Sequence, residues 1–160
     1  MRLAELNTAA EEELMPELLA CCDVPSWATT IVEKRPYDGV AALRDTADAA
    51  ARDLTDEQVD RALAKHPRIG ERPTGQGTEA GWSRQEQSGV TPDEALAQGN
   101  RDYEQRFGRV FLVCATGLGK EQILDALRQR LTNDEQTERG VVKDELRKIA
   151  LLRLGKLVTG

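Results

Sequence analysis

The sequence predicts an all-α protein that folds as one compact multi-helix domain. Apolar residues recur at three- and four-residue intervals along most of the chain, which places them on one face of a helix. The two-residue alternation of half-buried strands is nearly absent. The chain has 160 residues, 39% hydrophobic and 31% charged. This length suits one domain, residues 1–160, that buries roughly 70% of the surface its unfolded form exposes.

Charge and composition exclude several classes of protein. With 22 Lys plus Arg against 28 Asp plus Glu, the net charge is −6, which argues against a nucleic-acid partner. No apolar run is long enough to cross a bilayer. The first residues lack the pattern of a signal peptide, so we expect a cytoplasmic protein. Cys21, Cys22 and Cys114 offer no paired spacing for disulfides or for a metal.

Capping signals divide the first third of the chain into helices. Thr8 with Glu11 has the form of a capping box that opens the first helix, and Pro16 should break or kink that helix. Ser26 can cap a second helix. A third helix, between residues 36 and 54, carries the clearest buried stripe. The stripe consists of Val40, Leu43, Ala47, Ala50 and Leu54.

The middle of the chain combines a short helix with a loop. Thr55 with Gln58 forms another capping box, and Pro67 should stop the helix that this box opens. Residues 67–78 contain the glycines and prolines typical of a loop open to a ligand or partner. A helix resumes near Glu79.

Three signals organise the last third. Thr91 and Pro92 open a helix that Gly108 ends as its C-terminal cap. A further helix is marked by Ile123, Leu124, Leu127 and Leu131. Asn133 can cap a long final helix. Residues 110–114 form the one strand-like run, and a strand, a buried extended stretch and a piece of helix all stay open for it.

His66 is the only histidine and lies at the predicted end of a helix, on the apolar face that it shares with Val59 and Leu63. A helix C-terminus favours the protonated imidazole while burial opposes it. These opposing effects suit a group that exchanges protons near neutral pH. The alternative is a residue that only caps or packs, because an ability to titrate does not oblige a histidine to act.

Two other groups of residues are candidates for binding. Ser83, Glu86 and Gln87 would share one face of a helix, where they either grip a polar heterocycle or form a solvated surface. Arg153 interrupts a buried stripe, so its guanidinium should meet a carboxylate of the protein or of a substrate. The stripe consists of Val142, Leu146, Ile149, Arg153 and Leu157.

The segment that ends in Gly117-Leu118-Gly119-Lys120 resembles a phosphate-binding loop but fails its pattern. Cys114 stands where the first glycine should be, and Glu121 replaces the residue that would hold magnesium. A nucleotide site is therefore disfavoured. The backbone N–H groups of residues 113–117 can instead donate hydrogen bonds to anionic or carbonyl oxygens.

Taken together, several strings of residues resemble the signature of the OHCU decarboxylases, which act on 2-oxo-4-hydroxy-4-carboxy-5-ureidoimidazoline (OHCU). The most specific strings are His66-Pro67-Arg68-Ile69-Gly70-Glu71, Ser83 with Glu86-Gln87, Phe107-Gly108-Arg109-Val110-Phe111 and Arg153-Leu154. The likeness spans nearly the whole chain. It continues in Cys21-Cys22, Trp27-Ala28, Arg35-Pro36 and Arg130-Leu131-Thr132-Asn133.

The resemblance implies an all-helical homodimer that needs neither metal nor organic cofactor and binds a small anionic substrate. It assigns acid–base catalysis to His66, the polar edge of the substrate to Glu86, and the substrate's carboxylate or ring oxygens to Arg153. The pocket would be completed by Pro67, Ser83, Arg84, Gln85, Gln87, Val113, Cys114, Ala115, Thr116 and Gly117.

The expected reaction is therefore the decarboxylation of OHCU to (S)-allantoin and carbon dioxide in urate degradation. A rival of another class is a non-catalytic helical interaction module, in which His66 and Arg153 would be structural. A nucleotide-binding enzyme is the third alternative. Acceleration of carbon dioxide loss separates the first two, and titration with ATP and magnesium tests the third.

Overall fold

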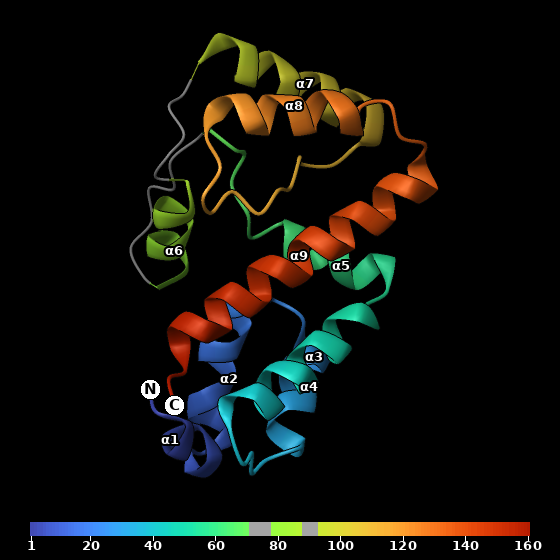
Figure 1. Cartoon of the computed structure of the whole chain (residues 1–160). Helices are drawn as coiled ribbons and strands as arrows, with labels where there is room; N and C mark the ends of the chain where they lie inside the picture. The colour runs from blue at the N-terminus through green and yellow to red at the C-terminus, as the bar shows by residue number, and fades with distance from the viewer. Residues whose placement is uncertain (71–77, 88–92) are drawn as a thin grey trace. The chain divides into compact units, whose positions relative to one another are not determined.

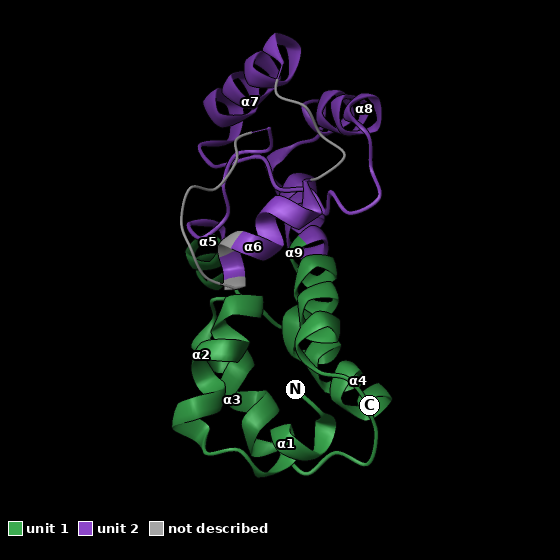
Figure 2. Ribbon diagram, turned by 90° about the vertical axis from the view of Figure 1, so that its left-hand side faces the viewer, with its two compact units in different colours: residues 1–62, 146–160 green, residues 63–145 purple. Residues whose placement is uncertain are grey.

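The computed structural model describes residues 1–70, 78–87 and 93–160, and this part of the chain is helical, as predicted (Figure 1). The helices are α1 (Leu3–Thr8), α2 (Glu11–Cys21), α3 (Pro25–Glu33), α4 (Val40–Arg52), α5 (Asp56–Leu63), α6 (Thr78–Glu86), α7 (Glu94–Phe107), α8 (Lys120–Arg130) and α9 (Glu135–Leu157). They form two compact units (Figure 2). Unit 1 comprises residues 1–62 and 146–160, and unit 2 comprises residues 63–145.

Unit 1 packs α2 against α3 and α3 against α4. Trp27 anchors this packing, because its buried indole Nε1 donates to the carbonyl oxygen of Ala47 at 3.0 Å. The C-terminal part of α9 is tied to α4 by Arg147, whose Nη1 lies 2.8 Å from Asp48 Oδ1. The two chain ends also meet in unit 1, where the Thr159 N–H donates to the Met1 carbonyl oxygen at 2.9 Å (Figure 1).

Two of the caps predicted near the N-terminus are wrong, and so is the break predicted at Pro16. Thr8 does not open a helix but ends α1, and its hydroxyl donates back to the Ala4 carbonyl oxygen at 3.0 Å. Pro16 does not end α2, which runs through it to Cys21, since the buried face of the helix offsets one lost backbone hydrogen bond. Ser26 is not a cap, because Pro25 occupies the first helical position, which suits its fixed φ.

Other local predictions are confirmed. α4 carries the predicted stripe from Val40 to Ala50, in which Leu43 and Ala47 are buried, and it ends before the last stripe residue, Leu54. The Thr55 capping box is present in both directions: the Thr55 N–H donates to Gln58 Oε1 at 2.9 Å, and the Gln58 N–H donates to Thr55 Oγ1 at 3.2 Å. A helix does resume at α6.

Unit 2 has its own core, with α7 packed against α8. The core consists of Ile69, Leu96, Tyr103, Phe111, Val113, Ala115, Ile123, Leu124 and Leu127. Gly99 allows the two helices to approach closely, because a Cβ at this position would lie 2.0 Å from Leu127 Cδ2. Residues 110–115 are neither helical nor paired in a sheet, so a buried extended stretch is the alternative that holds.

The caps of the last helices differ in part from expectation. Thr91 and Pro92 lie outside the described residues, and the N-cap of α7 is Asp93, whose carboxylate accepts from the Leu96 N–H at 2.7 Å. At the start of α9, Asp134 rather than Asn133 accepts the Thr137 N–H, at 2.7 Å. Gly108 ends α7 in the left-handed conformation, as predicted.

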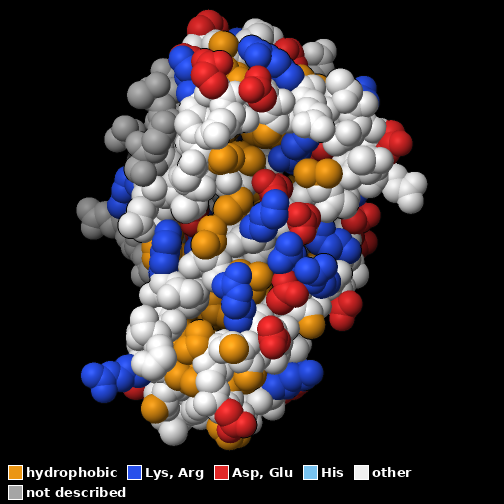
Figure 3. Space-filling model, in the orientation of Figure 1, with side chains coloured by type: hydrophobic (Ala, Val, Ile, Leu, Met, Phe, Trp, Pro, Cys, Tyr) orange, Lys and Arg blue, Asp and Glu red, His pale blue; other side chains and the backbone are white. Residues whose placement is uncertain are grey.

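On the face drawn in Figure 3, basic and acidic side chains lie side by side. Exposed ion pairs of this kind include Arg52 with Asp48 and Arg128 with Asp125. Such pairs contribute little to stability, but they intersperse the two signs of charge.

Candidate active site

His66 lies in a turn just after α5, three residues beyond the last helical residue, Leu63. Its backbone N–H donates to the Leu63 carbonyl oxygen at 3.0 Å, and its side chain is half-buried. The prediction that His66 ends the helix itself is therefore wrong. The reason is that Pro67 disfavours helical geometry at the residue before it.

The backbone that follows His66 is held from two sides. The Gly70 N–H donates to Gln87 Oε1 at 2.9 Å, which joins the histidine segment to the residue just after α6. The buried amide of Asn100, on α7, donates from Nδ2 to the Ile69 carbonyl oxygen at 2.8 Å. Gly70 has a φ of +89°, which a residue with a side chain rarely adopts. His66 thus sits on a backbone whose path is fixed within a few residues.

The predicted binding residues on α6 are not a uniformly solvated face. Ser83 is buried, with 3% of its surface exposed, and Glu86 and Gln87 are half-buried. Arg84 and Gln85 are exposed. The predicted helical spacing of Ser83 and Gln87 is confirmed. The Gln87 N–H donates to the Ser83 carbonyl oxygen at 3.2 Å, although α6 ends at Glu86.

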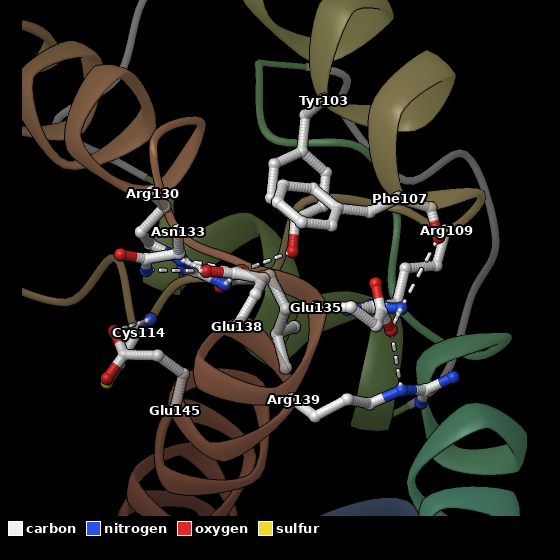
Figure 4. Close-up of polar contacts among 11 residues, drawn as sticks. Tyr103, Phe107, Arg109, Cys114, Arg130, Asn133, Glu135, Glu138, Arg139 and Glu145 are labelled. Carbon is white, nitrogen blue, oxygen red and sulfur yellow. Dashed lines mark hydrogen bonds and ion pairs between the residues drawn. The ribbon is translucent and has the colours of Figure 1, made fainter.

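The predicted backbone donors, residues 113–117, lead into α8. Val113 and Ala115 are buried, Cys114 is half-buried, and Thr116 and Gly117 are exposed. One of the amides is already used within the protein, because the Cys114 N–H donates to Glu145 Oε1 at 3.2 Å (Figure 4).

A buried polar network is centred on Glu138 (Figure 4). Glu138, fully buried on α9, accepts from Arg130 Nη2 at 2.6 Å and from Asn133 Nδ2 at 3.2 Å, and also accepts the Tyr103 hydroxyl. Burial and this hydrogen bond raise the pKa of Tyr103. Arg130 Nη1 donates to the Leu112 carbonyl oxygen at 2.5 Å, so the network extends to the backbone beside the predicted donors.

The lysine of the apparent phosphate loop has another partner. Lys120 Nζ lies 2.9 Å from Asp93 Oδ2, and this carboxylate raises the pKa of Lys120. The pairing agrees with the failed sequence pattern and leaves Lys120 occupied at the start of α8.

Arg153 belongs to unit 1, while the other predicted site residues belong to unit 2. Its side chain is buried, with 1% exposed, at the position in the α9 stripe where the sequence places it. Arg153 Nη1 donates to the Ala20 carbonyl oxygen at 3.1 Å. The pKa of the neighbouring Cys22 is raised to about 12, mainly by burial, with a smaller opposing effect of the Arg153 charge.

Unit 2 also contains a cavity of about 420 Å³ beside α7. Its lining includes Arg68, Asn100 and Arg101, and the buried Asn100 Oδ1 has no hydrogen-bond partner. Of the site residues that the sequence predicts and the structure describes, none lines this cavity.

The described part of the chain groups no three histidine, cysteine or acidic side chains in a way that could hold a metal ion. Within the same residues, no helix is both long enough and apolar enough to cross a membrane.

Comparison with known proteins decides the family. A family model described as OHCU decarboxylase matches residues 7–155, which covers almost the whole chain and both units. The chain belongs to the OHCU decarboxylase family.

Relatives of this family occur in bacteria and animals. The chain is 28% identical, over 98% of its length, to the uric acid degradation bifunctional protein of Bacillus sp. (strain TB-90). It is 35% identical, over 58% of its length, to the 2-oxo-4-hydroxy-4-carboxy-5-ureidoimidazoline decarboxylase of Amia calva. The chain spans only 32% of the first relative and therefore corresponds to a part of that protein. The second match covers 57% of the relative's length.

Two solved structures have the same fold as this chain. A crystal structure of OHCU decarboxylase in the presence of (S)-allantoin matches with a TM-score of 0.73 at 26% identity, covering 88% of this chain and 96% of that one. A crystal structure of (S)-allantoin synthase matches with a TM-score of 0.72 over 99% of this chain and 54% of that one. The second, at 18% identity, supports the fold alone.

Sequence reasoning missed several residues that make long-range polar contacts in or beside the candidate site. Asn100, Glu138 and Glu145 each bind a partner more than four residues away in the chain, so helical spacing carries no sign of the contact. One signal was available for Glu138. It lies four residues before Val142, so it continues the buried stripe of the last helix, and it follows Arg130 by eight residues. A buried acid near a buried arginine predicts an ion pair.

Proposed function

We propose that this chain catalyses the decarboxylation of OHCU to (S)-allantoin and carbon dioxide, as a cofactor-independent lyase of urate degradation. The observation that carries the proposal is the family match over residues 7–155. The structural match to an OHCU decarboxylase in the presence of (S)-allantoin supports the same substrate class.

The chemistry explains why no cofactor is needed. The substrate carboxylate sits on a ring carbon that also bears a hydroxyl and adjoins a carbon–nitrogen double bond. When the bond to the carboxylate breaks, its electron pair moves into that imine, whose nitrogen takes up a proton, and carbon dioxide leaves. The resulting enol then loses its hydroxyl proton and becomes the ring carbonyl of allantoin as a proton is added to the carbon that bears the ureido group. Hydrogen bonds and fixed geometry are sufficient to assist these steps.

His66 is the proposed acid–base group: it takes the hydroxyl proton or delivers the proton to the new stereocentre. Its fixed backbone supports this role, since the bonds from Gly70 to Gln87 and from Asn100 to Ile69 limit where the imidazole can lie. Precise placement of a proton donor is worth orders of magnitude in rate.

The remaining residues bind the substrate. Glu86 holds the polar edge of the ring, and the pocket around it is completed by Pro67, Ser83, Arg84, Gln85 and Gln87. The backbone of residues 113–117 donates to oxygens of the substrate. Arg153 holds the carboxylate or ring oxygens, because a planar guanidinium offers two parallel donors. Local cations and backbone donors offset the repulsion expected from a net charge of −6.

The assembly and location are also part of the proposal. We expect one functional domain spanning residues 1–160, a homodimer in solution, a cytoplasmic location, and no nucleic-acid partner. The family match across both units supports the single functional domain. Light scattering after size exclusion measures the mass of the assembly directly.

The deciding experiment measures carbon dioxide release from freshly prepared OHCU with catalytic amounts of protein, in the presence of a strong chelator. We expect rapid release of carbon dioxide and accumulation of (S)-allantoin, well above the spontaneous rate. No acceleration would favour the non-catalytic interaction module. Activity that disappears on dialysis against chelator and returns with zinc or manganese would contradict the cofactor-free mechanism.

A further inference from the structure

Residues 110–115, between α7 and α8, are neither helical nor paired in a sheet. Phe111, Val113 and Ala115 belong to the core of unit 2, whereas Leu112 is buried outside that cluster. This period of two within the core is the side-chain pattern of an extended backbone. In such a backbone, the N–H and C=O of one residue point to one edge, and those of the next residue point to the opposite edge.

One edge of this segment is anchored inside the protein. The Leu112 carbonyl oxygen accepts from Arg130 Nη1 at 2.5 Å. The Cys114 N–H donates to Glu145 Oε1 at 3.2 Å (Figure 4). Leu112 and Cys114 are two residues apart, so both groups lie on the same edge. The other edge carries the N–H groups of Val113 and Ala115.

We propose that Glu145 is a positioning residue that fixes this segment so that the Val113 and Ala115 N–H groups face the substrate. The inference rests on the proposed function and adds to it a residue that does not itself touch the substrate. Arg130 holds the carbonyl side of the same edge, and its pairing with the fully buried Glu138 keeps it in place. Loss of the Glu145 bond removes the anchor at Cys114 and allows the backbone there to rotate. The Val113 and Ala115 N–H groups are then no longer held in one direction.

Glu145 is also the better residue to test, because it can be changed without breaking the Arg130–Glu138 pair. Arg130 and Glu138 are buried, whereas Glu145 is half-buried. An amide at position 145 can still accept the Cys114 N–H, while a methionine of similar size and good helix propensity offers only a weak acceptor.

The experiment compares Glu145→Gln with Glu145→Met in steady-state decarboxylation of OHCU. We expect Glu145→Met to lower kcat/KM by about 10²-fold, the scale of a misplaced catalytic group. The loss should fall mainly on kcat, since donors aimed at developing charge act in the transition state. Glu145→Gln should stay within about threefold of wild type, because it keeps the acceptor. Glu121→Gln, which removes an exposed carboxylate at the start of α8, is the matched control and should behave as wild type.

A second measurement does not depend on catalysis. The chain has 3 cysteines, so ¹⁵N-cysteine labelling gives three backbone amide signals, of which that of Cys114 should exchange slowly in wild type and Glu145→Gln but quickly in Glu145→Met. Equal activity of the two variants, or a fast Cys114 amide in wild type, would overturn the positioning role. If wild type does not accelerate the reaction, the proposed function itself fails, which the first assay of wild type reveals. If Glu145→Met does not fold, Glu145→Lys replaces it, with the same expected loss.

Discussion

The buried ion pair of Arg130 and Glu138 provides the most direct test of how unit 2 is held together. Glu138 has 0% exposure and accepts from Arg130 Nη2 at 2.6 Å and Nε at 2.9 Å. Glu138→Leu removes the carboxylate and leaves the guanidinium of Arg130, 6% exposed, without its counter-charge. Removing one partner of a buried pair costs about 3–5 kcal/mol. We expect the free energy of unfolding to fall by this amount.

The double variant separates charge pairing from the rest of the network. Arg130→Met alone should cost about 3–5 kcal/mol, because it leaves Glu138 charged and buried. Combined with Glu138→Leu, it leaves no buried charge. The Leu112 carbonyl and the Tyr103 hydroxyl then lose their partners, at about 1–3 kcal/mol each. The half-buried Asn133 amide also loses its bond to Glu138, but water can replace that bond. The double variant should therefore be more stable than the two single losses predict, by about 4 kcal/mol.

Urea unfolding followed by circular dichroism measures these differences, with all four proteins studied at one pH. Tyr103→Phe is the mild control, since it removes one hydroxyl from the network and should cost about 1 kcal/mol. The two single losses in free energy of unfolding can be summed and compared with the loss in the double variant. If they agree to within about 0.5 kcal/mol, the charges do not interact as the structure implies, and the explanation of the network is wrong.

Four further predictions concern catalysis and pH. His66→Ala should lower turnover by about 10² or more while the circular dichroism spectrum stays native; undiminished turnover would make His66 structural. Arg153→Lys should lower kcat/KM by about tenfold or more, because one ammonium cannot reproduce a planar two-donor grip; an unchanged value would remove Arg153 from substrate binding. The Arg109 guanidinium, 2.8 Å from Glu135, holds the pKa of Glu135 below its usual 4.5, so this pair stabilises the fold above that pH and the stabilisation is lost as pH falls through the lowered pKa. Glu135→Gln should thus have a lower urea midpoint than wild type at neutral pH and an equal midpoint at about pH 2, and a difference that persists in acid would contradict the linkage. In heavy water, the enzyme should release allantoin that is deuterated at its stereocentre and optically active, because the proton arrives from one face; a racemic product formed at the accelerated rate would remove His66 from the acid role.

The fold class could be predicted from sequence because helix periodicity is a local property. The capping box of Thr55 and Gln58 is present with both bonds, since all its parts lie within four residues. The caps predicted at Thr8, Ser26 and Asn133 are wrong. Beside Ser26, Pro25 takes the first helical position, and beside Asn133, Asp134 accepts the Thr137 N–H. α2 starts after Ala10, which makes no side-chain capping bond. The spacing of polar residues does not rank such neighbours.

The candidate site could be predicted only as separate strings. His66, Ser83 and Arg153 were identified from helix position and from family resemblance, and the burial of Ser83 and Arg153 agrees with a role beyond surface solvation. What joins or supports these strings was not predictable. Asn100 reaches Ile69 across 31 residues, and Glu145 reaches Cys114 across 31 residues. Contacts at such separations depend on how helices pack, which no periodicity within one helix encodes.

The bond from Gly70 to Gln87 has a consequence for the chemistry of the site. A backbone N–H can only donate, so the atom of Gln87 that faces Gly70 at 2.9 Å must be the amide oxygen. The amide nitrogen of Gln87 then points away from Gly70. On the side away from Gly70, Gln87 therefore presents a hydrogen-bond donor and not an acceptor. In the proposed pocket, an anionic, carbonyl-rich substrate needs hydrogen-bond donors, and a freely rotating glutamine would offer donor and acceptor equally. The bond from Gly70 therefore fixes the polarity that we propose Gln87 presents to the substrate. It also links the histidine string to the end of α6, which is what a shared role in the proposed pocket requires.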